Sequence, residues 1–150
     1  NNIFSHRELE ARHEIMLETY IKKIQIESRV MANVAINHIL PAAIKYQNLL
    51  VNNVEGMKDI GMAKDTYSTQ IEMIKEISNH INIIKKNADE MVEARKKANN
   101  IENVRGRAIA YCDKVKAYFD VIRYNVDKLE LIVDDEVWPL PKYREMVAIR

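Results

Sequence analysis

The fold is decided by one uninterrupted stretch, residues 70–98, which reads QIEMIKEISNHINIIKKNADEMVEARKKA. It contains neither Gly nor Pro, and its apolar residues recur at steps of three, four and seven: Ile71, Ile74, Ile77, Ile81, Ile84, Ala88, Met91 and Ala98. Because an α-helix completes a turn in 3.6 residues, these side chains form one stripe along one side. The stretch therefore predicts a long amphipathic helix over residues 65–99, capped by Asp65 or Thr66 and ended by Asn99-Asn100.

The residues that follow repeat the same pattern. Residues 102–133 carry a second apolar stripe at helical spacing: Val104, Ala108, Tyr111, Val115, Tyr118, Ile122, Val126, Leu129 and Val133. A chain of this composition, with three Gly and three Pro in total, has little material for turns. We therefore expect few, long helices joined by short connections, so that neighbouring helices run antiparallel.

The residues that precede residue 65 predict a kinked pair of helices over 1–56. Ser5 and Glu8 have the spacing of a capping box, and an apolar stripe then runs through Leu17, Ile21, Ile24, Ser28, Met31, Ala35 and Ile39. Pro41 must kink or break this helix because it has no N–H to donate. A helical pattern resumes through Ala43, Tyr46, Leu49, Leu50 and Val54 and stops near Gly56, which leaves Asn52 to Thr66 as the longest loop.

The last segment, residues 134–150, cannot continue a helix through Pro139 and Pro141. Trp138 and Leu140 lie between or beside these prolines, and we expect them to fill a groove on the bundle surface. Pro141 is suited to the first position of a short terminal helix. Together these patterns predict an all-α fold. It is a single helical domain over 1–150, an elongated antiparallel bundle of three to four long helices with a short C-terminal helix.

The bulk composition excludes several classes of protein. The 150 residues include 23 basic and 22 acidic ones, so the basic excess of a nucleic-acid-binding protein is missing. No run approaches the roughly 20 apolar residues that span a membrane, and no signal peptide opens the chain. The single Cys112 excludes an internal disulfide and indicates a reducing, cytoplasmic setting. The first residue is Asn1 rather than Met, which predicts a segment of a longer protein.

Few residues are candidates for chemistry. Glu10 and His13 have the Glu-x-x-His spacing found in di-iron bundles, but Glu76 and His80, the nearest second pair, are spaced by four. We therefore predict no catalytic, cofactor-binding or metal-binding residue in the chain. Cys112 is expected to be a packed thiol, and His38 to form a hydrogen bond near the kink. The tyrosines at 20, 46, 67, 111 and 118 are expected to pack in or beside the core.

The first helix has more apolar surface than a simple bundle needs. At 100° per residue, Ile15 and Ile26 point about 20° apart, and both lie roughly opposite Leu17 and Ile24. Two explanations remain open from the sequence. The helix is central and has neighbours on both sides, or its second face docks onto another domain or chain.

Three segments of the chain together resemble the C-terminal region of the type III glutamine synthetases, the large bacterial class. The first segment is ELEARHEIMLETY with its continuation IKKIQIE, residues 8–27. The second is NHILPAA with the following Tyr46-Gln47, and the third is VWPLPKYRE, residues 137–145. The resemblance spans nearly the whole chain but depends on its two ends, because residues 52–129 are generic helix.

The resemblance implies that the chain is a non-catalytic helical extension that follows the catalytic domain of such an enzyme and supports domain packing, subunit assembly or regulation. The parent would join ammonia to glutamate with ATP, through γ-glutamyl phosphate and with Mg²⁺ or Mn²⁺, and would assemble as rings. The implied partners are its own catalytic domain and neighbouring subunits, and no catalytic or binding residue carries over to this chain. The alternative is a free-standing helical bundle that binds other proteins as an adaptor or sensor.

Overall fold

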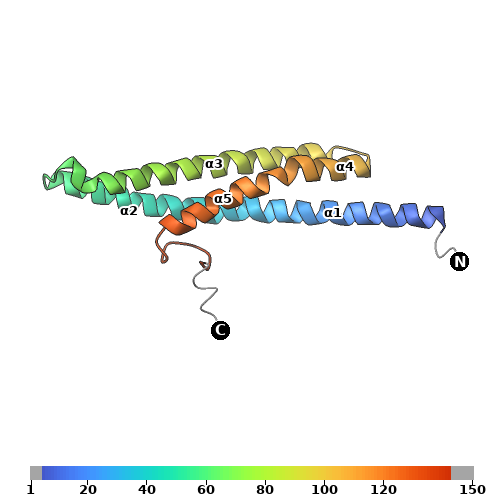
Figure 1. Ribbon diagram of the computed structural model, residues 1–150, viewed down its shortest axis with the longest axis horizontal. Coiled ribbons are helices and arrows are strands. Elements are labelled where there is room, and N and C mark those ends of the chain that lie inside the picture. Colours follow the sequence, from blue (N-terminus) through green and yellow to red (C-terminus); the bar gives the residue numbers. More distant parts are fainter. Residues whose placement is uncertain (1–4, 143–150) are drawn as a thin grey trace, which may run out of the picture.

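The computed structural model describes residues 5–142, and all regular elements in that range are helical (Figure 1). In chain order they are α1 (His6–Val34), η1 (Ala35–Ile39), α2 (Leu40–Asp59), η2 (Lys64–Tyr67), α3 (Ser68–Asn99), α4 (Val104–Ala110), η3 (Tyr111–Val115) and α5 (Ala117–Ile132). Here η1 and η3 are single π-helical turns and η2 is a 3₁₀ turn. The all-α prediction is confirmed.

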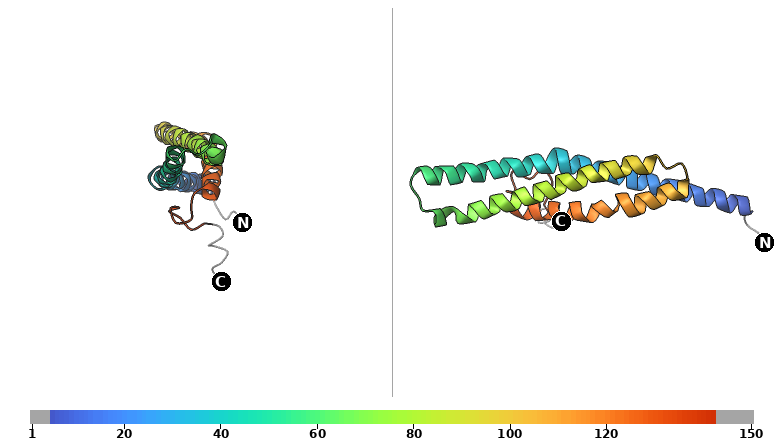
Figure 2. Two further views of the ribbon diagram at one scale, coloured as in Figure 1. Left: turned by 90° about the vertical axis from the view of Figure 1, so that its left-hand side faces the viewer. Right: turned by 90° about the horizontal axis from the view of Figure 1, so that it is seen from above.

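The elements form three long helical segments that run antiparallel. The first, α1–η1–α2, is one bent helix from His6 to Asp59, and α3 returns along it. The third, α4–η3–α5, runs back beside α3 and packs on it along most of its length, as the two views in Figure 2 show. The predicted elongated antiparallel bundle, with its first helix kinked near Pro41, is therefore confirmed.

The start of α1 is fixed by the predicted capping box. The Glu8 N–H donates to Ser5 Oγ at 3.3 Å, and the Ser5 N–H donates to Glu8 Oε2 at 2.7 Å. These two bonds satisfy donors that have no partner inside the helix.

Pro41 bends the first helix but does not break it. The π turn η1 immediately precedes the proline, and the Leu40 N–H donates to the Ala35 carbonyl, five residues back. An α-helix would bring the proline ring against the carbonyl four residues earlier, at Asn37. The wider π turn relieves this clash and lets α2 continue from Leu40.

The connection between α2 and α3 is shorter than the sequence predicted. Helix α2 continues through Gly56 to Asp59, so the loop predicted from Asn52 to Thr66 is wrong. The chain turns away from the helix axis two residues later, at Gly61, whose φ is 81°. There the Met62 N–H donates to the Met57 carbonyl and the Gly61 N–H to the Lys58 carbonyl, each at 3.0 Å. This is a Schellman ending, so Gly61 is the C-terminal glycine that the sequence analysis assigned to Gly56.

The predicted cap of the next helix is also wrong. Residues Lys64–Tyr67 form the 3₁₀ turn η2, and α3 begins at Ser68 without a side-chain cap. The Ser68 hydroxyl donates to the Asp65 carbonyl at 3.0 Å, so Asp65 acts through its backbone only. The 3₁₀ turn leads directly into α3, so the helix starts without a capping side chain. The predicted end at Asn99-Asn100 is confirmed, because α3 stops at Asn99.

The three predicted stripes form the core. Their fully buried members include Ser28, Ile39, Ile77, Ile84, Ala88, Met91, Tyr111, Val115, Ile122, Leu129 and Val133. Trp138 joins this cluster from the segment after α5, whereas Leu140 is exposed. The prediction that the tail fills a groove therefore holds for Trp138 and is wrong for Leu140. The short helix predicted from Pro141 onward falls largely outside the described residues.

Candidate interaction surface

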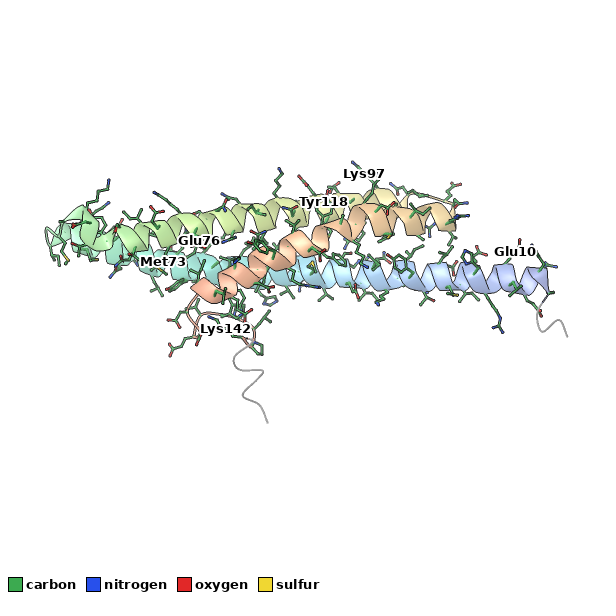
Figure 3. The ribbon with its side chains drawn as sticks, viewed as in Figure 1. Glu10, Met73, Glu76, Lys97, Tyr118 and Lys142 are labelled. Carbon is green, nitrogen blue, oxygen red and sulfur yellow. The ribbon has the colours of Figure 1, made fainter. Side chains whose placement is uncertain are left out.

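The two pairs that were considered for metal chemistry lie on different helices, and His80 Nε2 is 3.7 Å from Glu76 Oε1 within the second pair. Glu10 and His13 are exposed near the start of α1, whereas Glu76 and His80 lie on α3 (Figure 3). Within residues 5–142 no three His, Cys, Asp or Glu side chains come close enough to hold a metal ion. The two half-motifs are therefore not brought together.

His80 has a structural partner that the sequence did not reveal. Its Nδ1 lies 2.8 Å from Asn125 Oδ1, and both side chains are buried between α3 and α5. The Asn125 amide is oriented because its Nδ2 donates to the Val121 carbonyl at 2.8 Å. Since the amide oxygen can only accept, His80 must donate from Nδ1. The only signal in the sequence was a polar residue, Asn125, beside the apolar stripe of residues 104–133.

Cys112 is exposed, so the prediction of a packed thiol is wrong. It lies in the π turn η3, where the Lys116 N–H donates to the Tyr111 carbonyl at 2.9 Å. The wide turn keeps Tyr111 and Val115 in the core and leaves Cys112 outside. The thiol is hydrogen-bonded to the Tyr20 hydroxyl, and this bond, together with partial burial, raises the pKa of Tyr20 to about 12.

The tyrosines occupy the predicted positions. Tyr67 and Tyr111 are buried, and the other three of the five are half-buried. The Tyr111 hydroxyl donates to Asn99 Oδ1, and burial raises the pKa of Tyr111 above its usual value near 10. The prediction for His38 is wrong, because its side chain is exposed at the bend and forms no hydrogen bond with the residues from 5 to 142.

The second apolar face of α1 is open to solvent. Ile15, Ile26 and Val30 are 61%, 62% and 56% exposed, whereas Ile21 and Ile24 on the opposite side are buried. We call these three residues the outer face of α1. No other element among residues 5–142 covers them, so the explanation in which α1 is central and has neighbours on both sides does not hold for this part of the chain.

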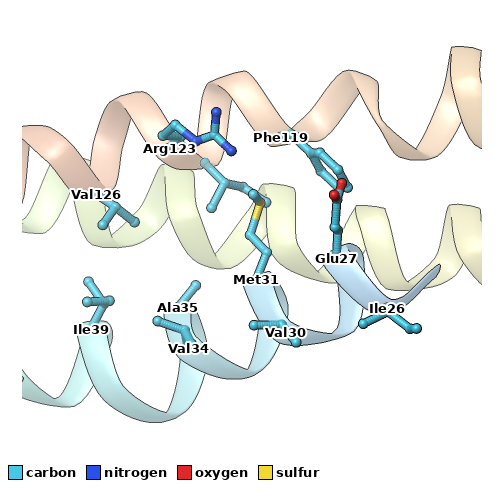
Figure 4. Close-up of a pocket in the computed structure, with 11 residues that line it drawn as sticks. Ile26, Glu27, Val30, Met31, Val34, Ala35, Ile39, Phe119, Arg123 and Val126 are labelled. Atoms are coloured by element: carbon cyan, nitrogen blue, oxygen red, sulfur yellow. The ribbon is translucent and has the colours of Figure 1, made fainter. Parts of the chain in front are cut away.

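A groove between the first helix and α5 adjoins this face. It has a volume of about 500 Å³, and Figure 4 shows the side chains that line it. Buried side chains of Ala35, Ile39 and Ile122 form its floor, and Glu27 and Arg123 are its only charged lining residues. The remaining lining residues are apolar: Ile26, Val30, Met31, Val34, Phe119 and Val126. We call it the α1–α5 groove; its lining suits apolar side chains rather than a polar metabolite.

A second groove lies between α3 and the α4–η3–α5 segment, with a volume of about 740 Å³. Two of its carboxylates form ion pairs with lysines of the same helix. Asp89 pairs with Lys85 at 2.6 Å and Glu93 with Lys96 at 2.7 Å. These exposed pairs indicate an ordinary solvated face rather than a binding site.

No helix in the described part of the chain is long and apolar enough to cross a membrane.

Comparisons with known proteins agree on one family. A protein-family model described as the glutamine synthetase C-terminal domain matches residues 1–58. The chain is 47% identical to a glutamine synthetase of Bacteroides fragilis over 97% of its length. It is 27% identical to a type-3 glutamine synthetase of Dictyostelium discoideum and 25% identical to a glutamine synthetase of Butyrivibrio fibrisolvens, over 100% and 98% of its length. The chain spans only about a fifth of each relative, 20% or 21%.

Proposed function

Because the chain is homologous to the C-terminal region of glutamine synthetases, a type-3 enzyme among them, we propose that it is a non-catalytic helical module of such an enzyme. Its role is to support domain packing and subunit assembly. The activity proposed for the whole enzyme is the ATP-dependent ligation of ammonia to glutamate, carried out in the cytoplasm. The binding of ATP and of Mg²⁺ or Mn²⁺ is assigned to the rest of that enzyme.

The observation that carries this proposal is the outer face of α1 with the adjoining α1–α5 groove. Three large aliphatic side chains on one helix are more than half exposed, and they lie at the lip of an apolar groove. Contiguous exposed apolar surface marks a site of interaction with another protein surface. The proposed partners are the catalytic domain of the same polypeptide and neighbouring subunits of a homo-oligomeric ring.

The side chains of residues 5–142 do not suit the binding of ATP with a divalent cation. Such a cation takes several oxygen ligands that converge on one point, and no three carboxylate or imidazole groups converge in residues 5–142. The α1–α5 groove has one carboxylate, Glu27, and one guanidinium, Arg123, on its lining. This donor set supports a role in packing rather than in phosphoryl transfer.

The proposal is tested in a full-length glutamine synthetase that carries this segment. We would delete the segment and, separately, make the double substitution Ile15→Lys with Ile26→Lys. Assembly mass is measured by light scattering and the synthetase rate by release of phosphate. We expect smaller assemblies and a synthetase rate that falls with them, because the proposal includes active sites that form between the subunits of the ring.

The matched control is Leu131→Lys, a substitution at a side chain that is 80% exposed on α5 and outside both the outer face and the groove. It should leave mass and rate unchanged. If the deletion and the double substitution both leave the assembly mass and the rate as they were, the module does not support assembly, and the proposal is wrong.

A further inference from the structure

The outer face of α1 lies on a helix whose charge is divided between its two halves. Residues 6–20 contain four Glu and two Arg, a net charge of −2 with His neutral. Residues 21–34 contain two Lys, one Arg and one Glu, a net charge of +2. A helix with an acidic first half and a basic second half is complementary to its own copy when the two run antiparallel.

The apolar residues have the same internal symmetry. In an antiparallel pair centred between Tyr20 and Ile21, Ile15 of one copy lies opposite Ile26 of the other. The pairing also brings Glu18 to the height of Lys22 and Lys23 of the second copy. At 100° per residue Glu18 and Lys22 lie on the same edge of the outer face, about 40° apart, so the two charges meet across the pair. Opposed helix dipoles favour the same orientation.

We propose that the outer face of α1 is a self-association site, at which two copies of this chain pair antiparallel through Ile15 and Ile26. The inference depends on the proposed function because it identifies the partner in subunit assembly as the same segment of another subunit. The occupant is a second copy rather than an unrelated surface because both halves of the required complement, apolar and charged, are present on α1 itself.

The geometry of the bundle leaves this face accessible. The buried stripe of α1 faces α3 and α4, and the outer face is on the opposite side of the helix. All residues from Ser5 to Met16 are exposed, and Figure 2 shows the start of α1 extending past the turn between α3 and α4. A second copy can therefore lie along α1 without displacing any described element.

The first test measures the mass of this 150-residue chain by sedimentation velocity over a range of concentrations. We expect a dimer that dissociates on dilution. Ile26→Glu should raise the dissociation constant by more than about tenfold, because each substitution acts twice in a symmetric interface and buries a charge among aliphatic side chains. Leu131→Glu is the matched control and should leave the dissociation constant unchanged. Circular dichroism checks that both variants remain helical.

The second test determines the orientation, in a Cys112→Ser background that removes the native thiol. One sample carries Ile15→Cys alone and another is a mixture of the Ile15→Cys and Ile26→Cys chains. In the antiparallel pair the two residues at position 15 are separated by about 16 Å along the helix axis. A bismaleimide linker too short for that distance should therefore join the mixed chains and should not join Ile15→Cys to itself.

The inference is overturned if the chain is monomeric at every concentration, if Ile26→Glu and Leu131→Glu have equal effects, or if Ile15→Cys links to itself. None of these results would contradict the proposed function, because the outer face would then contact the catalytic domain, and the full-length deletion would still reduce assembly. Conversely, a dimer of this chain combined with an unaltered assembly in the deletion variant would support self-association and refute the role in the enzyme.

Discussion

At the scale of single residues, the buried pair His80–Asn125 is the feature whose energetic role is best defined. The histidine ring and the amide are both buried, and His80 Nδ1 lies 2.8 Å from Asn125 Oδ1. Removing one partner destabilises the fold, because the other partner stays buried without a hydrogen bond and its desolvation is no longer compensated. Replacing both partners by apolar side chains changes stability little. The pair therefore fixes how α3 and α5 fit together more than it adds to stability.

A double-mutant cycle tests this interpretation. Asn125→Leu should lower the free energy of unfolding by about 1–3 kcal/mol because it leaves His80 Nδ1–H without an acceptor. The double variant His80→Leu with Asn125→Leu should lose less than the sum of the single changes, as measured by urea unfolding. Asn79→Leu, at an exposed position on α3, is the control and should change stability by less than about 0.5 kcal/mol. Strict additivity of the two changes would contradict the interpretation.

Two tyrosine hydroxyls with raised pKa values, Tyr20 and Tyr111, give the chain a sensitivity to alkaline pH. Burial raises the pKa of Tyr111, and the bond to Cys112 raises that of Tyr20 to about 12. A raised pKa means that the folded chain holds the proton more tightly than the unfolded chain does. The stabilising contribution is therefore complete below about pH 10, the ordinary tyrosine pKa, and is lost as pH rises from there toward the folded-state pKa.

We accordingly expect the free energy of unfolding to fall between pH 10 and 12, by at most about 1.4 kcal/mol per pH unit for each such tyrosine. Tyr111→Phe should show a shallower decline over the same interval, since it has no proton to lose there. Urea unfolding at pH 8, 10 and 11 measures both slopes. Equal slopes in the two proteins would show that Tyr111 ionises alike in the folded and unfolded chains.

At the scale of elements, the two glycines of the first turn region have opposite backbone requirements. Gly56 lies inside α2, and Gly61 has a φ of 81° at the helix end. A Cβ atom would meet no other atom within 4 Å at either position, so packing does not distinguish them. Any difference between substitutions at these two positions must therefore come from the backbone.

Gly56→Ala should raise the free energy of unfolding by about 0.5–1 kcal/mol, because glycine in a helix costs conformational entropy. Gly61→Ala should lower it by about 1–2 kcal/mol, because an L-residue is strained in the left-handed region. Each variant serves as the control for the other in urea unfolding. A stabilising Gly61→Ala would mean that the Schellman ending of α2 is absent in solution.

The sequence predicted the helices and their buried stripes well, but not their local irregularities. Steps of three and four residues place Ile77, Ile84 and Met91 in the core whatever the detail of the turns. The π turn η3 keeps Tyr111 and Val115 in the core at a four-residue step that an α-helix would also show, so the pattern did not reveal it. The turn shifts the buried face after it, so that Phe119 is buried rather than Tyr118, and Cys112 was assigned to the wrong side. The length of α2 was underestimated because a helical glycine costs only about 1 kcal/mol, which tertiary packing overrides.

At the scale of the whole molecule, the apolar surface that the bundle buries is unevenly distributed. α3 is covered by both other segments along its length, whereas every residue in the first three turns of α1 is exposed. The sequence already identified two apolar faces on α1 but could not tell whether a neighbour within the chain covers the second. That question depends on the paths of the other helices in space, which apolar periodicity does not record.

This uneven burial predicts a gradient of stability along the molecule. A helical segment of about three turns is marginal in water by itself, so residues 6–16 should open without unfolding the bundle. Hydrogen exchange followed by mass spectrometry should show rapid exchange there in the dilute chain, and slow exchange in the middle of α3. In the assembled full-length enzyme, residues 6–16 and the outer face of α1 should become protected while α3 changes little. Protection of residues 6–16 in the dilute monomer, or its absence in the assembly, would show that no partner stabilises this end of the helix.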